Sequence, residues 1–127
     1  MNLVDSSGWL EYFSDGPRAS VFGKPLIDVE KLIVPTICLY EVFKVALRER
    51  GEDAALQAAA LMSNGTIVDL TSEIALQAAK ISLELKIPTA DSIVLATGQF
   101  YQATIWTQDS DFEKIRGVKY FPKVKKL

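Results

Sequence analysis

The sequence has no histidine among its 127 residues and only one cysteine, Cys38. Without histidine, Ser-His-Asp and Cys-His nucleophile systems and paired-histidine acid–base catalysis are excluded. A conventional structural zinc site and an internal disulfide are excluded as well. A hydrolase with this composition has to rely on carboxylates, hydroxyls and a hard metal ion bound through oxygen, such as Mg²⁺ or Mn²⁺.

The sequence also lacks any apolar run of about 18 residues, the length that a membrane helix needs. No basic segment precedes the first apolar residues, so we expect no signal peptide and a cytoplasmic protein. The net charge of −2 favours no class of partner. Lys119, Lys123, Lys125 and Lys126 near the C-terminus form either a locally basic surface or a solvated chain end. A chain of this length, nearly half of it apolar, is expected to form one domain over residues 1–127.

Short apolar segments alternate with helical patterns along the whole chain. Strands are expected at 2–4, 32–34, 66–68, 104–106 and 118–121, and helices after 5–7 and over 36–50, 52–63, 71–86 and 89–101. A weaker helical stretch from Arg18 is expected to be interrupted by Gly23 and Pro25. The alternation predicts an α/β domain with a mostly parallel sheet, whose continuously apolar strands are covered on both faces.

Four acidic residues are predicted to meet at the carboxyl edge of this sheet, where α/β proteins build their sites. Asp5 and Asp109 each follow a strand directly, whereas Glu41 lies in the second turn, and Asp91 in the first turn, of helices that begin at the same edge. Crowded carboxylates either take up protons or bind cations. A divalent ion held there can activate water and stabilise charge at a phosphate. The sequence therefore suggests a hydrolytic nuclease.

Each of these acids also has a purely structural interpretation. Asp5 can be a helix cap, Asp91 a favourable charge at a helix N-terminus, and Asp109 a turn residue. Glu41 is harder to explain in this way because its helical neighbours at i−4 and i+4 are apolar. A Lys44 or Arg48 partner could still satisfy it. The coincidence of all four acids at one edge favours the site.

Further polar residues lie close to this edge. If the strand order is 3-2-1-4-5, Asp69 follows a marginal strand and lies far from the site. Asp111 either joins the metal site or caps the turn that carries Phe112. Thr107 should share a side with Asp109 and take part in the site. Ser7 is either a helix-capping residue or a ligand for a carboxylate, a metal-bound water or a phosphate.

The segments that carry these acids resemble those of the PIN-domain family, and within it the VapC-type toxins of prokaryotic toxin–antitoxin pairs. The similar segments are Leu3–Ser7, Pro35–Val42, Thr89–Thr97 and Thr107–Phe112. The resemblance implies a three-layer α/β/α fold and an endoribonuclease that depends on Mg²⁺ or Mn²⁺. It implies that Asp5, Glu41, Asp91 and Asp109 form an acidic quartet accompanied by Thr107. It further implies a homodimer that is inhibited by a small cognate VapB-type antitoxin.

Three other functions are compatible with parts of the pattern. The first is an RNA-processing PIN nuclease without an antitoxin. The second is a phosphoacceptor signalling domain with Asp69 as acceptor, although Ser6 and Ser7 stand where a second acid is expected and no lysine lies near Thr107. The third is a binding protein whose acids are structural. The aromatic residues Trp9, Tyr12 and Phe13 belong either to the core or to a groove for a partner.

Overall fold

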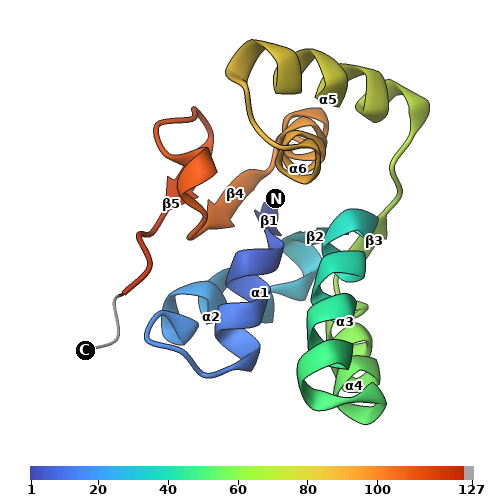
Figure 1. Ribbon diagram of the computed structural model, residues 1–127, viewed down its shortest axis with the longest axis vertical. Coiled ribbons are helices and arrows are strands. Elements are labelled where there is room, and N and C mark those ends of the chain that lie inside the picture. The colour runs from blue at the N-terminus through green and yellow to red at the C-terminus, as the bar shows by residue number, and fades with distance from the viewer. Residues whose placement is uncertain (125–127) are drawn as a thin grey trace.

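The computed structural model describes residues 1–124 (Figure 1). The strands are β1 (Asn2–Val4), β2 (Leu32–Pro35), β3 (Thr66–Val68), β4 (Thr104–Thr107) and β5 (Val118–Tyr120). The helices are α1 (Ser6–Phe13), α2 (Ala19–Ile27), α3 (Thr36–Arg50), α4 (Glu52–Met62), α5 (Ser72–Leu85) and α6 (Thr89–Phe100). Two short 3₁₀ helices, η1 (Val29–Lys31) and η2 (Ser110–Phe112), complete the element order. Lys125 and Lys126, half of the predicted basic cluster, lie outside the described residues.

The strands form one five-stranded parallel sheet in the order β3-β2-β1-β4-β5, as predicted. The central strand is β1, in which Leu3 is in register with Ile33 of β2 on one side and Ile105 of β4 on the other. Because all strands run the same way, their carboxyl ends lie at one edge. The strand order therefore places the residues that follow β1 and β4 next to each other at the middle of that edge.

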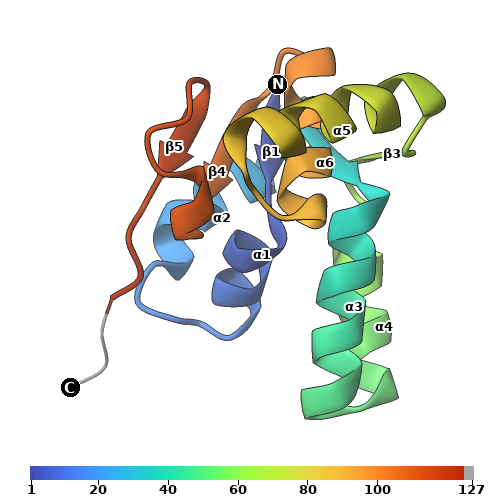
Figure 2. The ribbon, with the colours of Figure 1, turned by 45° about the horizontal axis from the view of Figure 1, so that its top comes forward.

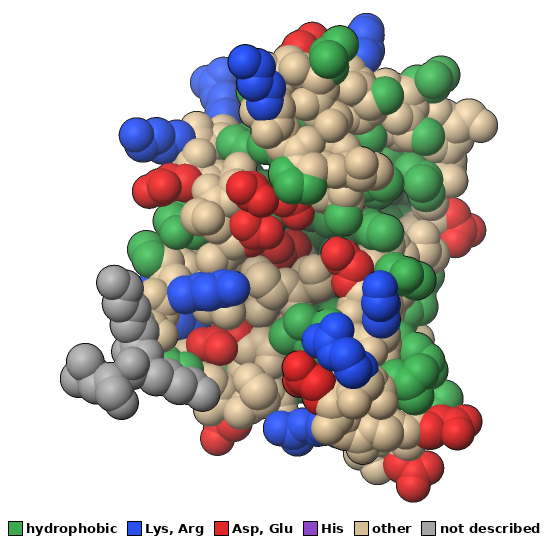
Figure 3. Space-filling view, in the orientation of Figure 1, with side chains coloured by type: hydrophobic (Ala, Val, Ile, Leu, Met, Phe, Trp, Pro, Cys, Tyr) green, Lys and Arg blue, Asp and Glu red, His purple; other side chains and the backbone are tan. Residues whose placement is uncertain are grey.

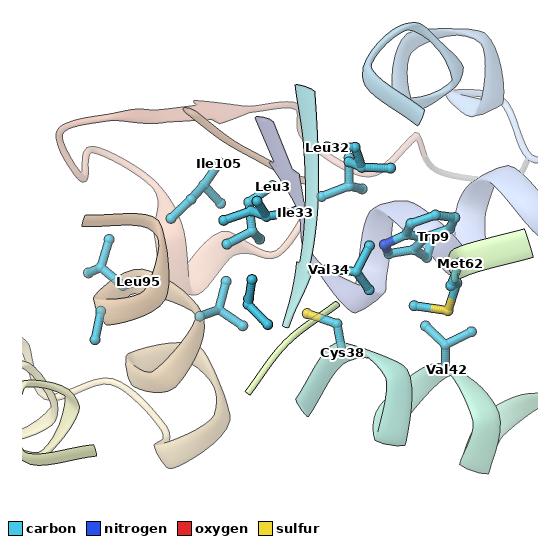
Figure 4. Packing of buried hydrophobic residues seen from close by; sticks show 14 of the residues in the cluster. Leu3, Trp9, Leu32, Ile33, Val34, Cys38, Val42, Met62, Leu95 and Ile105 are labelled. Atoms are coloured by element: carbon cyan, nitrogen blue, oxygen red, sulfur yellow. The ribbon is translucent and has the colours of Figure 1, made fainter. Parts of the chain in front are cut away.

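The sheet is covered on both faces, which confirms the three-layer α/β/α architecture. Figure 4 shows that alternate strand residues serve opposite faces, because side chains along a strand point alternately up and down. Leu3, Ile33 and Ile105 lie toward Leu95 of α6, whereas Val34 lies on the other side with the core residues of α1, α3 and α4. α5 packs on α6 and forms the outermost element of that side (Figure 2).

Two glycines allow helices to approach the sheet closely. A Cβ atom at Gly8 of α1 would lie 2.5 Å from the Val4 side chain, and one at Gly98 of α6 would lie 2.7 Å from Ile105. Real Cβ atoms do not tolerate such distances, so larger residues would push the helix away. The close approach of α1 is important for the site, because α1 begins directly after β1.

The predicted interruption at Gly23 and Pro25 is wrong, because α2 continues through both residues. Pro25 and its neighbour Leu26 are buried, and this burial offsets the loss of the hydrogen bond that proline removes. A Cβ atom at Gly23 would come within 3.3 Å of the Tyr12 ring, so glycine here permits the packing of α2 on α1. Tertiary packing has overridden the local helix-breaking signals.

The aromatic residues of α1 divide between core and surface. Trp9 is buried and stacks on Phe13 with ring centroids 5.6 Å apart, whereas Tyr12 is exposed. Phe13 is half-buried and lines a groove between α1, α3 and α4. None of the helices within residues 1–124 is long and apolar enough to cross a membrane.

Candidate active site

Asp5 lies directly after β1 and is almost completely buried, with 3% of its surface exposed. Its carboxylate accepts hydrogen bonds from the Gly8 N–H (3.2 Å), the Ser7 hydroxyl (2.6 Å) and the Thr107 hydroxyl (2.8 Å). It is therefore the N-cap of α1 and also the partner of a residue 102 positions away. Burial raises the pKa of Asp5 to about 6, although its three donors act in the opposite direction.

Thr107 links the ends of β1 and β4. Its hydroxyl donates to Asp5 and accepts a hydrogen bond from the Asp109 N–H at 2.9 Å. The Asp5 N–H in turn donates to the Trp106 carbonyl at 3.1 Å, which extends the strand pairing by one residue. This completely buried hydroxyl therefore fixes two acids of the edge relative to each other. It is committed to carboxylate and backbone partners rather than to a ligand.

Ser7 plays a part close to that of Thr107. Its hydroxyl donates to Asp5, accepts from the Gln108 N–H at 3.2 Å and lies 3.3 Å from the Thr107 hydroxyl. Because Asp5 supplies the N-cap, the capping interpretation of Ser7 does not hold. Ser7 orients Asp5.

Three further acids lie close together beside Asp5 and Thr107. One carboxylate oxygen each from Asp91, Asp109 and Asp111 lies within 4.8 Å of the others. Asp109 also caps η2, because its carboxylate accepts the Asp111 N–H at 2.9 Å. Figure 3 shows acidic side chains gathered at the centre of this face of the molecule. Of the two interpretations of Asp111, the structure favours membership of the acidic group, since Asp109 acts as the cap.

The crowding has an electrostatic consequence. The pKa of Asp91 is raised to about 8. Burial is the main cause, followed by the charge of Asp109 and then by a hydrogen bond and the charge of Asp111. At neutral pH such a group is neutralised by a proton or by a cation. The donor set consists of oxygens alone, which suits a hard divalent ion such as Mg²⁺ or Mn²⁺. The residues present therefore fit the predicted metal.

Glu41 lies nearby but is not part of the close group of Asp91, Asp109 and Asp111. Its Oε1 accepts a hydrogen bond from the Ser6 hydroxyl at 2.9 Å. Neither predicted basic partner pairs with it in residues 1–124. Lys44 lies 5.7 Å from the centre of the Tyr40 ring, and Arg48 pairs with Glu49.

The buried Cys38 lies near three of the predicted acids. The pKa of its thiol is raised well above the usual range, mainly by burial and then by the charges of Asp5, Glu41 and Asp91. Cys38 lies one turn before Glu41 on α3 and has no exposed surface. Four acids were predicted at this edge, and the structure places all four around the ends of β1 and β4.

Asp69 follows β3 at the sheet margin, is exposed and is not among the grouped acids. Its predicted distance from the site agrees with this position. A phosphoacceptor role would need a second acid and a lysine beside it, and the acids gather elsewhere. This position gives the signalling-domain interpretation no support.

Sequence reasoning missed two polar residues at the site. One is Ser6, whose bond to Glu41 spans 35 positions of sequence. The other is Gln108, which is buried between Thr107 and Asp109 and whose amide oxygen has no hydrogen-bond partner within residues 1–124. The sequence did contain a signal for Gln108, because this glutamine directly follows a buried strand and precedes an acid. A side-chain amide buried in such a place usually has a hydrogen-bond partner, so a polar neighbour could have been expected.

An open groove of about 560 Å³ begins at these polar residues and runs between α1, α3 and α4. Ser6, Ser7 and Gln108 line it, together with apolar side chains that include Val45 and Leu61. Its charged lining residues are of both signs, Glu11, Glu49, Arg50 and Lys123. The groove thus joins the acidic edge to an apolar surface.

Comparisons with known proteins agree with this fold. A toxin–antitoxin complex from Klebsiella pneumoniae contains a chain with 25% identity and a TM-score of 0.79, covering 97% of this chain and 100% of that one. DNA-bound VapBC from Salmonella typhimurium has 15% identity and a TM-score of 0.77, covering 96% and 98%. The sarcin–ricin loop cleaving toxin VapC20 from Mycobacterium tuberculosis has 19% identity and a TM-score of 0.73, covering 88% and 92%.

The last two likenesses, at below 25% identity, establish the fold alone. No curated protein matches the sequence. The family model described as PIN domain matches residues 3–118, which include every acid of the site. The chain therefore belongs to the PIN domain family.

Proposed function

We propose that this chain is a cytoplasmic endoribonuclease dependent on Mg²⁺ or Mn²⁺ and the toxin of a VapBC-type pair. The observation that carries the proposal is the all-oxygen acidic group at the carboxyl edge, in which burial and the neighbouring acids raise the pKa of Asp91 to about 8. The similarity to a chain from a toxin–antitoxin complex supports the toxin assignment.

Asp91 and Asp109 would hold the ion together with Asp5 and Glu41, and the exposed Asp111 lies beside them as an accessory acid. A divalent ion bound there would lower the pKa of a water molecule and stabilise charge at the phosphodiester during in-line displacement. The protein itself contributes fixed positions, since Thr107 and Ser7 hold Asp5 and Thr107 holds the Asp109 backbone. Unneutralised, these acids would repel an RNA phosphate, so cation binding also permits substrate binding.

The proposal is tested by mapping the ends of cellular RNAs after brief induction of the wild type and of the Asp5→Asn form. We expect new ends only with the wild type, and we expect purified protein to cleave RNA with Mg²⁺ or Mn²⁺. Full activity in excess EDTA would contradict a metal-dependent mechanism.

We further propose that the groove between α1, α3 and α4 receives an antitoxin segment with an apolar face. Leu61 of α4 lines the groove with 53% of its surface exposed, whereas Leu56 of the same helix is 52% exposed and does not line it. Leu61→Asp should weaken binding to the product of the neighbouring open reading frame by about tenfold, and Leu56→Asp should leave it unchanged. Equal effects of the two substitutions would argue against the groove.

An RNA-processing nuclease without an antitoxin would use the same acids. Toxicity on expression, relieved by co-expression of the neighbouring reading frame, separates the toxin from that alternative. We also expect a homodimer, which sedimentation of the purified protein tests. A monomer at micromolar concentration would contradict this expectation without affecting the nuclease assignment.

A further inference from the structure

Ser6 connects the start of α1 to α3 at two points. Its hydroxyl donates to Glu41 Oε1 at 2.9 Å, and its backbone lies close enough to Cys38 to lower the pKa of that thiol against the effect of burial. Cys38 and Glu41 are three positions apart on α3, so both lie on the helix side that faces α1. The N-cap of α1 is Asp5, so the Ser6 hydroxyl is not needed to satisfy the helix terminus.

Glu41 requires such a contact because nothing else in the described structure orients its charge. The side chain has three rotatable bonds, and the charges around Cys38 that come from Asp5 and Asp91 are of its own sign. The nearby cations do not restrain it, since Lys44 lies over Tyr40 and Arg48 pairs with Glu49. Repulsion would turn an unrestrained Glu41 toward solvent.

We propose that Ser6 is the positioning residue for Glu41: by fixing Oε1, it sets where Oε2 is presented to the cation site. Within residues 1–124, the Ser6 hydroxyl is the only hydrogen-bond donor to the Glu41 carboxylate, which leaves Oε2 available. The inference rests on the proposed function, because it assigns a role in holding the cation.

The neighbouring serines then have separate tasks. Ser6 donates to Glu41 of α3, while Ser7 donates to Asp5 and approaches Thr107 of β4. Successive residues of an α-helix point about 100° apart, so one serine cannot serve both acids. A pair of adjacent hydroxyls at the start of α1 therefore orients acids on both sides of the site.

The test is the affinity for Mn²⁺, measured by calorimetry on the full chain without RNA. Ser6→Ala should weaken Mn²⁺ binding about tenfold to a hundredfold, the range typical of residues that orient metal ligands. Ser6→Thr keeps the hydroxyl and should stay within about threefold of the wild type. Ser20→Ala removes an exposed hydroxyl from α2 and should change nothing.

A double-mutant cycle separates positioning from a general structural role. In a Glu41→Ala background, Ser6→Ala should change Mn²⁺ affinity by less than about twofold, because the residue it acts through is gone. Wild-type affinity for Ser6→Ala, or an undiminished loss in the Glu41→Ala background, would overturn the proposal. If Ser6→Ala does not fold, Ser6→Cys replaces it with the same expectations, since a thiol is a weak donor.

These outcomes differ from a failure of the proposed function. If the wild type binds no Mn²⁺ and cleaves no RNA, the metal-dependent nuclease itself is wrong. If the wild type binds Mn²⁺ and Ser6→Ala binds it equally well, only the role of Ser6 is wrong.

Discussion

Asp5 and Asp91 lie at the same edge of the sheet, yet their carboxylates have different surroundings. Asp5 is nearly fully buried and accepts three hydrogen bonds, from one backbone amide and two hydroxyls. Asp91 is less buried, but its closest polar neighbours are two other acids. The pKa of Asp5 rises to about 6 and that of Asp91 to about 8. Burial is the main cause of both rises, so the difference between the two pKa values comes from the hydrogen-bond donors around Asp5 and the acidic neighbours of Asp91.

The difference suggests two roles within one site. Asp5 is part of the framework, because its bonds join α1, β1 and β4 whether or not a cation is bound. The charge of Asp91 has no donor comparable to those of Asp5, so under the proposed function it is the acid most dependent on a cation. Substitutions should therefore affect stability and activity differently at the two positions.

The largest effect is expected for Asp91→Asn. This change removes one charge from the proposed cation site, so RNA cleavage should fall by more than the hundredfold typical of outer residues of metal sites. The metal-free protein should be slightly more stable at pH 8, because a repulsive charge is gone. Cleavage of a fluorogenic RNA and thermal melting measure the two effects.

Asp69→Asn is the matched control, since it makes the same change after β3 at an exposed position. It should leave cleavage within about twofold of the wild type, the spread expected for surface substitutions. Equal losses at the two positions would mean that activity depends on overall charge rather than on this site.

The next largest effect is expected for the hydrogen bonds that hold Asp5 in place. Thr107→Val removes a donor to Asp5 and an acceptor for the Asp109 N–H in a buried position. We expect the free energy of unfolding to fall by about 1–3 kcal/mol and cleavage to fall about tenfold to a hundredfold. Thr104→Val, at the start of the same strand, should have little effect on either quantity. Urea unfolding and RNA cleavage provide the measurements.

A third prediction uses pH. Both acids have folded-state pKa values above the ordinary value of 3.8, so the folded protein binds more protons than the unfolded chain between about pH 4 and 8. The metal-free protein should lose stability as pH rises through that window. Saturating Mn²⁺ should therefore raise the Tm by roughly 5–10 °C at pH 8 and by clearly less at pH 5.5. The same increase at both pH values in melting experiments would contradict this linkage.

The smallest effect is expected for Asp111→Asn. Asp111 is exposed, and its backbone N–H still bonds to Asp109 after the change. Cleavage should fall by less than about tenfold, because an exposed charge is screened by solvent. The pKa of Asp91 should also decrease, because the Asp111 charge that helps to raise it is removed. NMR titration of the carboxyl groups would detect this decrease. A loss as large as that of Asp91→Asn would make Asp111 an essential metal ligand.

Much of the fold was predictable because the sequence signals are local and repeated. Short apolar segments with intervening helical patterns predicted five strands in nearly the observed places, and the strand order was confirmed. The error at Gly23 and Pro25 came from treating helix-breaking residues without their tertiary contacts. Burial of Pro25 and the contact of Gly23 with Tyr12 belong to the packed domain rather than to any sequence window.

The acids of the site could be proposed because each follows a strand or opens a helix at one edge. Their partners could not, since a hydroxyl bonded to a distant carboxylate leaves no local pattern. The bonds from Ser6 to Glu41 and from Thr107 to Asp5 span 35 and 102 positions. The separation of Glu41 from the close group of Asp91, Asp109 and Asp111 depends on side-chain distances that no periodicity encodes.

By itself, the sequence determined that a metal site in this chain would have to use oxygen ligands, because it contains no histidine and a single cysteine. It also determined which acids reach the carboxyl edge, because a parallel sheet brings its strand ends together. Only the tertiary structure decided how those acids are neutralised. Burial and hydrogen bonding depend on which side chains meet across the sheet, so Asp5 received three donors and Asp91 received two acids.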